Sequence, residues 1–184
     1  MVTASMEGTR AILVELQALA SATNLGTPRR TILGLDPNRV ALLAAVMEKI
    51  LGMQLMSYDI FMNVAGGVKV TEPAMDMAIV AAVASSFLDK AISDNTVVLG
   101  EIGLTGEVRA IGQADTRIAE SRKMGFSRCL LPKSNLKRLP DIDGIEIEGV
   151  AIRAEGARPL NGEVRDSELH SESVVQVPTP RTED

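Results

Sequence analysis

Aromatic residues are scarce in this chain of 184 residues. They make up 2% of the sequence, with no tryptophan, one tyrosine and three phenylalanines. Single-stranded nucleic-acid modules stack bases on aromatic side chains, so this composition argues against a module of that kind. The core must instead be built from aliphatic residues and the nine methionines, within a hydrophobic content of 46%.

Cysteine and histidine each occur once. Cys129 has no second cysteine with which to form an internal disulfide or a zinc site, and the apolar run around it predicts a buried strand residue. His170 lies in a polar stretch near the carboxyl end. These counts argue against serine–histidine, cysteine–histidine and histidine–metal catalysis built from this chain alone.

Long apolar runs are also missing. No stretch reaches the roughly 20 residues that a transmembrane helix needs, and the first residues do not form a signal-peptide pattern. We therefore expect a cytoplasmic protein with no membrane partner. The net charge of −5 is concentrated in residues 161–184, a polar, acidic stretch that we interpret as a disordered tail. Residues 1–160 are expected to form one domain with its own core.

Within that domain the hydrophobic pattern alternates between strands and helices. Apolar runs bounded by turn residues predict strands over residues 9–20, 31–34, 58–64, 96–104, 108–111, 128–131 and 145–150. Helical spacing predicts helices over residues 37–51, from Pro73 onward, over 114–124 and near 152–158. Asp36 is placed to cap the first helix and Gly52 to end it. This alternation predicts an α/β domain of two layers.

The central stretch is residues 63–76, NVAGGVKVTEPAMD. A glycine pair turns the chain, a short polar segment follows, and Pro73 begins a helix that is apolar on almost every side. Such a helix is buried inside a domain. A turn that meets a helix start is a suitable place for an active site, but position 74 is an alanine.

Five blocks of the sequence carry a family resemblance: EGTRAILVELQALAS, LGLDPNRVALLAAVMEK, NVAGGVKVTEPAMDMAIVAAVASS, GEIGLTGEVRAIG and AESRKMGFSRCLLP. Together they resemble the carboxy-terminal domain of the bacterial DNA-repair family RadA (also called Sms), which is itself similar to the proteolytic domain of the Lon proteases. The resemblance covers residues 6–160. It implies an α/β, two-layer mixed-sheet domain of the Lon proteolytic domain / ribosomal protein S5 domain 2-like type.

Lon-type proteases use a serine nucleophile at the start of this helix and a lysine base further along the chain. Carried over without gaps, the resemblance puts Ala74 at the serine position and Arg117 at the lysine position. Alanine has no oxygen with which to attack a carbonyl, and arginine stays protonated and cannot accept a proton. The resemblance thus implies a chain that is not an enzyme and has no catalytic residue; the alternative is an active Lon-type serine peptidase domain.

Two carboxylates flank the alanine. Asp76 has two open interpretations: a first-turn helix carboxylate favoured by the macrodipole, or an ion-pair partner of Arg117 across the former catalytic site. Glu72 is interpreted as the residue that precedes the helix proline.

The resemblance further implies an oligomerisation scaffold and DNA-contact module in recombinational repair, where the family processes branched DNA. Family members also carry an amino-terminal zinc finger and a RecA-like ATPase, so ATP, magnesium and zinc are implied for those portions. This chain has no GxxxxGK[ST] loop and no CxxC, and we expect no cofactor or metal in it. The implied partners are DNA, the RecA-like ATPase domain of the same protein and further copies of the chain, in a hexameric ring.

Basic side chains provide candidates for the DNA contact. The predicted residues are Arg29, Arg30, Arg117, Arg122 and Lys123. The first two lie in a Gly/Pro loop that is free to project, and they also suit contact with a neighbouring subunit. Phosphate contact needs only positive charge at the surface, so ordinary solvated charges remain the alternative.

Overall fold

The structure is a computed structural model that describes residues 1–23 and 26–151. Its strands are β1 (Val2–Glu7), β2 (Arg10–Ala22), β3 (Arg30–Leu33), β4 (Tyr58–Val64), β5 (Thr96–Val98), β6 (Glu101–Ile102), β7 (Val108–Arg109), β8 (Arg128–Pro132) and β9 (Glu146–Val150). Its helices are α1 (Pro37–Leu51), α2 (Asp76–Phe87), α3 (Ala114–Lys123) and α4 (Lys133–Leu136), with 3₁₀ turns at Leu55–Ser57, Ala65–Gly67 and Pro73–Met75. In this part of the chain no helix is both long and apolar enough to cross a bilayer.

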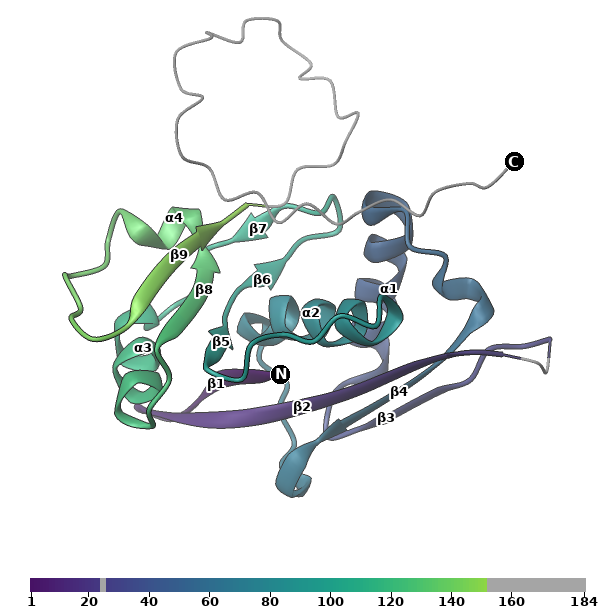
Figure 1. The fold of residues 1–184 in the computed structure, drawn as a ribbon, viewed down its shortest axis with the longest axis horizontal. Coiled ribbons are helices and arrows are strands. Elements are labelled where there is room, and N and C mark those ends of the chain that lie inside the picture. Colours follow the sequence, from purple (N-terminus) through teal and green to yellow (C-terminus); the bar gives the residue numbers. More distant parts are fainter. Residues whose placement is uncertain (24–25, 152–184) are drawn as a thin grey trace, which may run out of the picture.

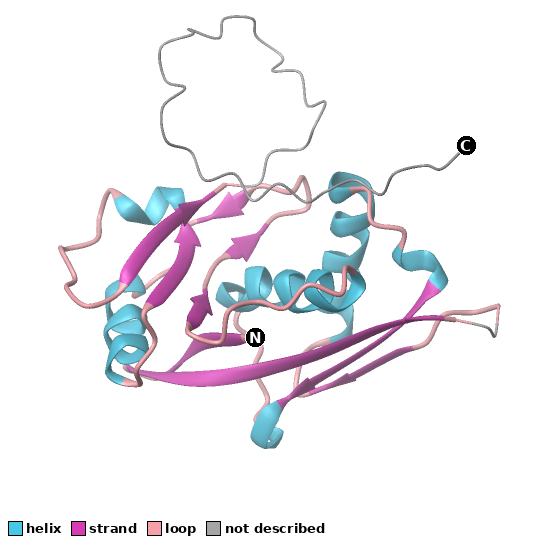
Figure 2. Ribbon diagram, viewed as in Figure 1, coloured by secondary structure: helices cyan, strands magenta, loops and turns pink. Residues whose placement is uncertain are grey.

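Seven strands form one mixed sheet in the order β3-β4-β2-β1-β5-β8-β9, and β6 pairs with β7 in a separate hairpin (Figure 2). The long strand β2 connects the two halves of the sheet. Its first half pairs antiparallel with β1 and its second half pairs antiparallel with β4 on the opposite edge. The predicted α/β mixed-sheet fold is confirmed. The helix predicted near 152–158 and the tail at 161–184 lie outside the described residues.

Helices cover the two faces of the sheet at different ends (Figure 1). Val14 and Leu16 of β2 pack with α1 and α2 in the larger of two apolar clusters. Their neighbour Leu13 packs instead with Ala4 in the second cluster, which includes Ile118 of α3. Side chains alternate between the faces of a strand, so α3 lies across the sheet from α2. The second face of β2, β4 and β3 carries no helix among the described residues.

Local sequence signals identified α1 correctly. The Asp36 side chain accepts a hydrogen bond from the Asn38 N–H at 2.9 Å, and Pro37 occupies the first turn. Gly52 follows the helix in the left-handed conformation, with φ of 67°. These are the signals that a capped helix needs at its two ends, and they do not depend on the rest of the fold.

Two other predictions differ from the structure. No strand was predicted before residue 9, but Val2–Glu7 forms β1, because it pairs with residues 10–15 of β2. The predicted strand 96–104 is interrupted at Gly100, which has a φ of 154°. A side chain at Gly100 would overlap Met77 of α2. The chain therefore leaves the main sheet at this glycine and forms the β6–β7 hairpin.

Candidate functional site

The start of α2 lies inside the sheet. β1 and β5 share one paired position, Val2 with Val97. Beyond this position the two strands separate, and residues 72–74 lie between them and form hydrogen bonds on both sides. The Met6 N–H donates to the Glu72 carboxylate at 2.9 Å on one side, and the Gly100 N–H donates to the Ala74 carbonyl at 2.8 Å on the other. The predicted site is thus held rigidly between two strands.

Ala74 contributes only a methyl group to this site. It is 5% exposed and belongs to the apolar cluster that includes Leu99 and Ile118. The adjoining cavity has a volume of about 110 Å³ and is lined by residues that include Arg39, Thr71 and Met75. Ligand pockets measure about 300–1,000 Å³, so this cavity is too small for a typical substrate.

Arg117 is buried on α3, with 2% of its surface exposed. Its Nε donates to the Gly112 carbonyl at 3.0 Å, and its Nη1 donates to the Ala4 carbonyl at 2.6 Å and to Glu72 Oε2 at 3.1 Å. A second bond, from Nη2 to Glu72 Oε1, completes a bidentate ion pair. This forked geometry is specific to arginine, and all three guanidinium nitrogens are bound, by β1, by the loop before α3 and by Glu72.

The interpretation of Asp76 as an ion-pair partner of Arg117 is wrong. Arg117 pairs with Glu72, and Asp76 pairs with Arg39 of α1. Asp76 does lie in the first turn of α2, as the simpler interpretation predicted. The role of Glu72 was missed, because no local signal distinguishes it from a residue that precedes a helix proline.

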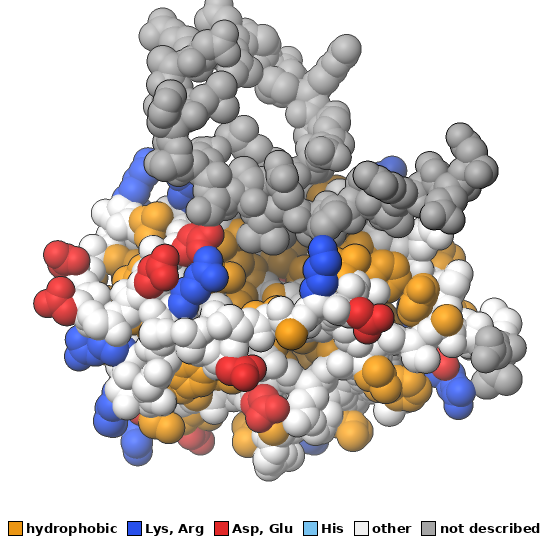
Figure 3. All heavy atoms as spheres, in the orientation of Figure 1, with side chains coloured by type: hydrophobic (Ala, Val, Ile, Leu, Met, Phe, Trp, Pro, Cys, Tyr) orange, Lys and Arg blue, Asp and Glu red, His pale blue; other side chains and the backbone are white. Residues whose placement is uncertain are grey.

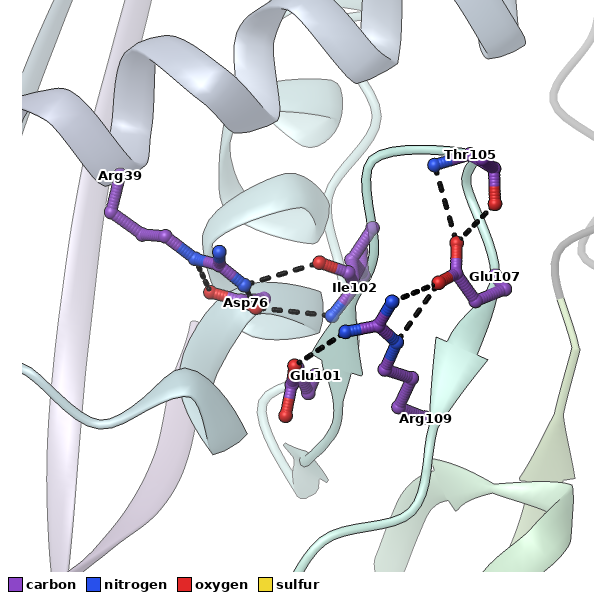
Figure 4. A network of polar contacts seen from close by, with 7 residues as sticks. All are labelled: Arg39, Asp76, Glu101, Ile102, Thr105, Glu107 and Arg109. Carbon is purple, nitrogen blue, oxygen red and sulfur yellow. Dashed lines mark hydrogen bonds and ion pairs between the residues drawn. The ribbon is translucent and has the colours of Figure 1, made fainter.

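A second polar network lies on the other side of α2 (Figure 4). Arg39 Nε donates to Asp76 Oδ1 at 2.9 Å, while the Ile102 N–H donates to Asp76 Oδ2 at 3.0 Å and the Ile102 carbonyl accepts from Arg39 Nη2 at 3.1 Å. On the same hairpin, Arg109 is bound to Glu101 and Glu107. Cations from two different helices thus bind the two carboxylates at the start of α2.

The pKa of Glu72 reflects this environment. Burial by itself raises the pKa, but hydrogen bonds from Arg117, the Met6 N–H and the Ser5 hydroxyl, together with the Arg117 charge, bring it below its ordinary value. Glu72 is therefore a stable anion at neutral pH. A basic side chain beside it is held in its charged form.

The residues predicted to contact DNA do not form one surface. Arg117 is buried in its ion pair with Glu72 and cannot reach a phosphate. The prediction that Arg117 contacts DNA is therefore wrong. Arg29 and Arg30 adjoin the loop between β2 and β3, at the opposite end of the molecule from Arg122 and Lys123 on α3 (Figure 1). On the face seen in Figure 3, basic side chains are interspersed with acidic ones.

The exposed basic side chains differ in how far hydrogen bonds and ion pairs hold them. The Arg30 guanidinium donates to the Leu55 and Tyr58 carbonyls, and Arg29 lies 3.5 Å from the Asp59 carboxylate. The Lys123 side chain is 73% exposed and lies 3.5 Å from Glu120. Lys123 is the most available of these charges.

Cys129 is fully buried in β8, as predicted, and burial raises the pKa of its thiol to about 12. Such a thiol is not a nucleophile at neutral pH. Within residues 1–23 and 26–151, no three His, Cys, Asp or Glu side chains are grouped to hold a metal ion.

The Glu72–Arg117 pair generates a prediction for stability. Replacing Glu72 with Gln leaves Arg117 buried without a counter-charge, which costs on the order of 3 kcal/mol. We expect the free energy of unfolding, measured with urea at pH 7, to fall by about that amount. The matched control is Glu120→Gln, which breaks an exposed pair and changes stability by less than about 1 kcal/mol.

The same pair makes stability depend on pH. Because the pKa of Glu72 is lower in the folded state, its contribution is present above the unfolded pKa and is lost as the pH falls through the folded pKa. Stability of the unmodified chain should therefore decrease as the pH drops below about 4.5, and Glu72→Gln should remove part of that decrease. Equal slopes for the two proteins would contradict the assignment.

Comparison with known proteins identifies the family. The family model described as the Lon protease (S16) C-terminal proteolytic domain matches residues 43–157. The DNA repair protein RadA of Bacillus subtilis is 51% identical over 161 residues, which are 88% of this chain and 35% of that protein. The DNA repair protein RadA of Listeria monocytogenes is 43% identical over 157 residues, 83% of this chain and 34% of that protein.

This chain spans about a third of the length of those relatives. The resemblance inferred from the five sequence blocks is confirmed. On the family match and the mixed α/β sheet, the chain belongs to the family of the Lon protease (S16) C-terminal proteolytic domain, in the form found in DNA repair proteins named RadA.

Proposed function

We propose that this chain is the non-catalytic Lon-like domain of a RadA-type DNA-repair ATPase, where it acts as an oligomerisation scaffold and DNA-contact module in recombinational repair. One observation carries the non-catalytic part. Ala74 stands where the family resemblance places the nucleophile, and Arg117 stands at the base position, bound bidentately to Glu72. The relatives named DNA repair protein RadA support the association with repair.

The chemistry of peptide hydrolysis supports this proposal. An acyl transfer needs a nucleophile and a base that removes its proton. Ala74 supplies no nucleophilic atom, and a guanidinium bound to a carboxylate keeps its proton. Glu72 adds a further obstacle, because its charge would also hold a lysine at position 117 in the protonated form.

Peptidase activity provides a direct test. The unmodified chain should not be labelled by a fluorophosphonate probe and should not cleave casein, since it has no nucleophile at position 74. The double variant Ala74→Ser/Arg117→Lys should also remain unlabelled, because Glu72 keeps the new lysine charged. An active Lon-type protease serves as the positive control. Labelling of the unmodified chain would establish the alternative function, a working serine peptidase.

The scaffold role is supported by the uncovered face of the sheet. Leu19 of β2 is 56% exposed and Leu33 of β3 is 59% exposed. Phe61 of β4 lies opposite Leu19 in the ladder and next to Thr31 of β3. Exposed apolar groups on one face are typical of protein interfaces. We assign this face to contact between copies of the chain, in the hexameric ring that the resemblance implies.

The corresponding prediction is that Leu19→Glu/Leu33→Glu dissociates the assembly. Two buried charges at an apolar interface are strongly unfavourable. Light scattering coupled to size exclusion should show a particle of several chains for the unmodified protein and a monomer for the double variant. Leu104→Glu is the control, because Leu104 is 66% exposed on the β6–β7 hairpin, away from this face. An unmodified chain that stays monomeric at every concentration would contradict the scaffold role.

The DNA-contact role is assigned to two separate pairs of charges, Arg29 with Arg30 and Arg122 with Lys123. Contacts to phosphate depend on surface charge and not on base sequence. Because the pairs lie at opposite ends of the molecule, each would contact the backbone independently.

We expect the chain to bind duplex DNA at low salt, with an affinity that falls as salt rises. Alanine substitution of either pair should reduce the slope of log affinity against log salt by about 0.9 for each phosphate that the variant no longer neutralises. Arg10→Ala is the control, because Arg10 is exposed at the first position of β2, next to the turn from β1. Absence of binding at low salt, or variants that match the control, would remove the DNA-contact role.

A further inference from the structure

One edge of β2 is only partly paired. Its first half bonds to β1, and the ladder ends where the Met1 amino group donates to the Leu16 carbonyl at 3.0 Å and the Leu16 N–H donates to the Met1 carbonyl at 2.7 Å. From Gln17 to Ala22 the same edge has no pairing strand in the described part of the chain. This free edge continues in line with β1.

A cavity of about 500 Å³ follows that edge. It is lined by Gln17 and Ala18 of β2, by Ala82 and Ser86 of α2, and by Ser93 and Thr96 before and within β5, with Met1 at its end. The cavity is therefore a slot between β2 and the segment leading into β5, with α2 on one side. It lies where a strand extended upstream from β1 would run.

The slot holds main-chain groups with no strand to bind. In an antiparallel ladder the N–H and C=O groups of alternate residues point to the same edge, so Ala18 and Ala20 follow Leu16 in facing the slot. The Ala20 N–H is bound to the Ser86 hydroxyl at 2.9 Å. Among the described residues, no group forms a hydrogen bond with the Ala18 N–H or carbonyl on this edge. Its amide and carbonyl are available to a strand.

We propose that this slot binds an extended stretch of polypeptide that enters β1 from its amino-terminal side and continues β1 antiparallel to β2. The occupant is joined to the chain in line, because the Met1 amino group lies at the end of the slot and the ladder register extends directly from it. Relatives are about three times as long as this chain, so they contain polypeptide that can fill the slot. A joined segment also binds without the entropy cost of a separate molecule.

The register specifies the side chains of the occupant. Residues opposite Ala18 and Ala20 would face α2, where Ala82 and Ser86 leave room for small aliphatic groups. Residues opposite Gln17 and Leu19 would be polar and would lie on the outer face of the sheet, beside the surface assigned to contact between copies. The slot thus recognises a strand of alternating polar and small apolar residues, and it anchors the adjoining part of the longer protein against α2. This inference is independent of the proposed DNA contact and assembly.

The test compares three forms of the chain. The first is residues 1–184, and the second carries a six-residue amino-terminal extension of alternating Val and Thr, with Thr next to Met1. The third has Pro in place of the Val opposite Ala18, which removes a ladder donor. Hydrogen exchange of the Ala18 amide should slow at least tenfold in the second form only. The Leu19 amide, which faces β4, is the internal control, and urea unfolding verifies that all three forms fold.

Three outcomes would overturn the proposal. Equal exchange at Ala18 in all forms would show that the slot does not take a joined strand. Protection of the unextended chain that rises with protein concentration would identify a second copy as the occupant. Equal protection by the free peptide Val-Thr-Val-Thr-Val-Thr at equimolar concentration would identify a separate partner.

Discussion

The buried ion pair between Glu72 and Arg117 determines how the central helix enters the sheet. A buried guanidinium that loses its counter-charge is strongly destabilising, so the elements that surround Arg117 must keep their positions. These elements are β1, through the Ala4 carbonyl, the start of α2, through Glu72, and α3, which carries Arg117 itself. The ion pair thereby maintains the geometry of the segment that leads into α2.

The second ion pair complements the first. α2 is apolar on most of its surface, and apolar packing alone specifies the rotation and axial position of such a helix weakly. Glu72 binds a cation from α3, and Asp76, one helical turn later, binds a cation from α1. Because the two cations approach from different helices, only one placement of α2 satisfies both carboxylates. We infer that these pairs give the core a unique arrangement more than they add to its stability.

The predictability of each feature from the sequence depends on the range of the interaction that produces it. The cap at Asp36 and the glycine at position 52 act within one helical turn, so the bounds of α1 followed from the sequence. Arg117 and Glu72 are separated by 45 residues. Glu72 and Asp76 both lie near the helix start, and either carboxylate could attract Arg117. The choice between them depends on how β1 and β5 diverge. β1 was missed for a related reason, because its strand is defined by its partner on β2 and not by its own composition.

Strand β2 connects the Glu72–Arg117 ion pair with the uncovered face and the unpaired edge of the sheet. One face of this strand supports α2, and its first half pairs with β1, which in turn donates to Glu72. Its second half leaves one face uncovered at Leu19 and one edge unpaired at Ala18, within the described part of the chain. The start of α2, where the family resemblance places a nucleophile, holds the Glu72–Arg117 ion pair and the Ala74 methyl group. The uncovered face and the unpaired edge are therefore both features of β2, and the ion pair before α2 helps to hold β2 and α2 in the arrangement that forms them.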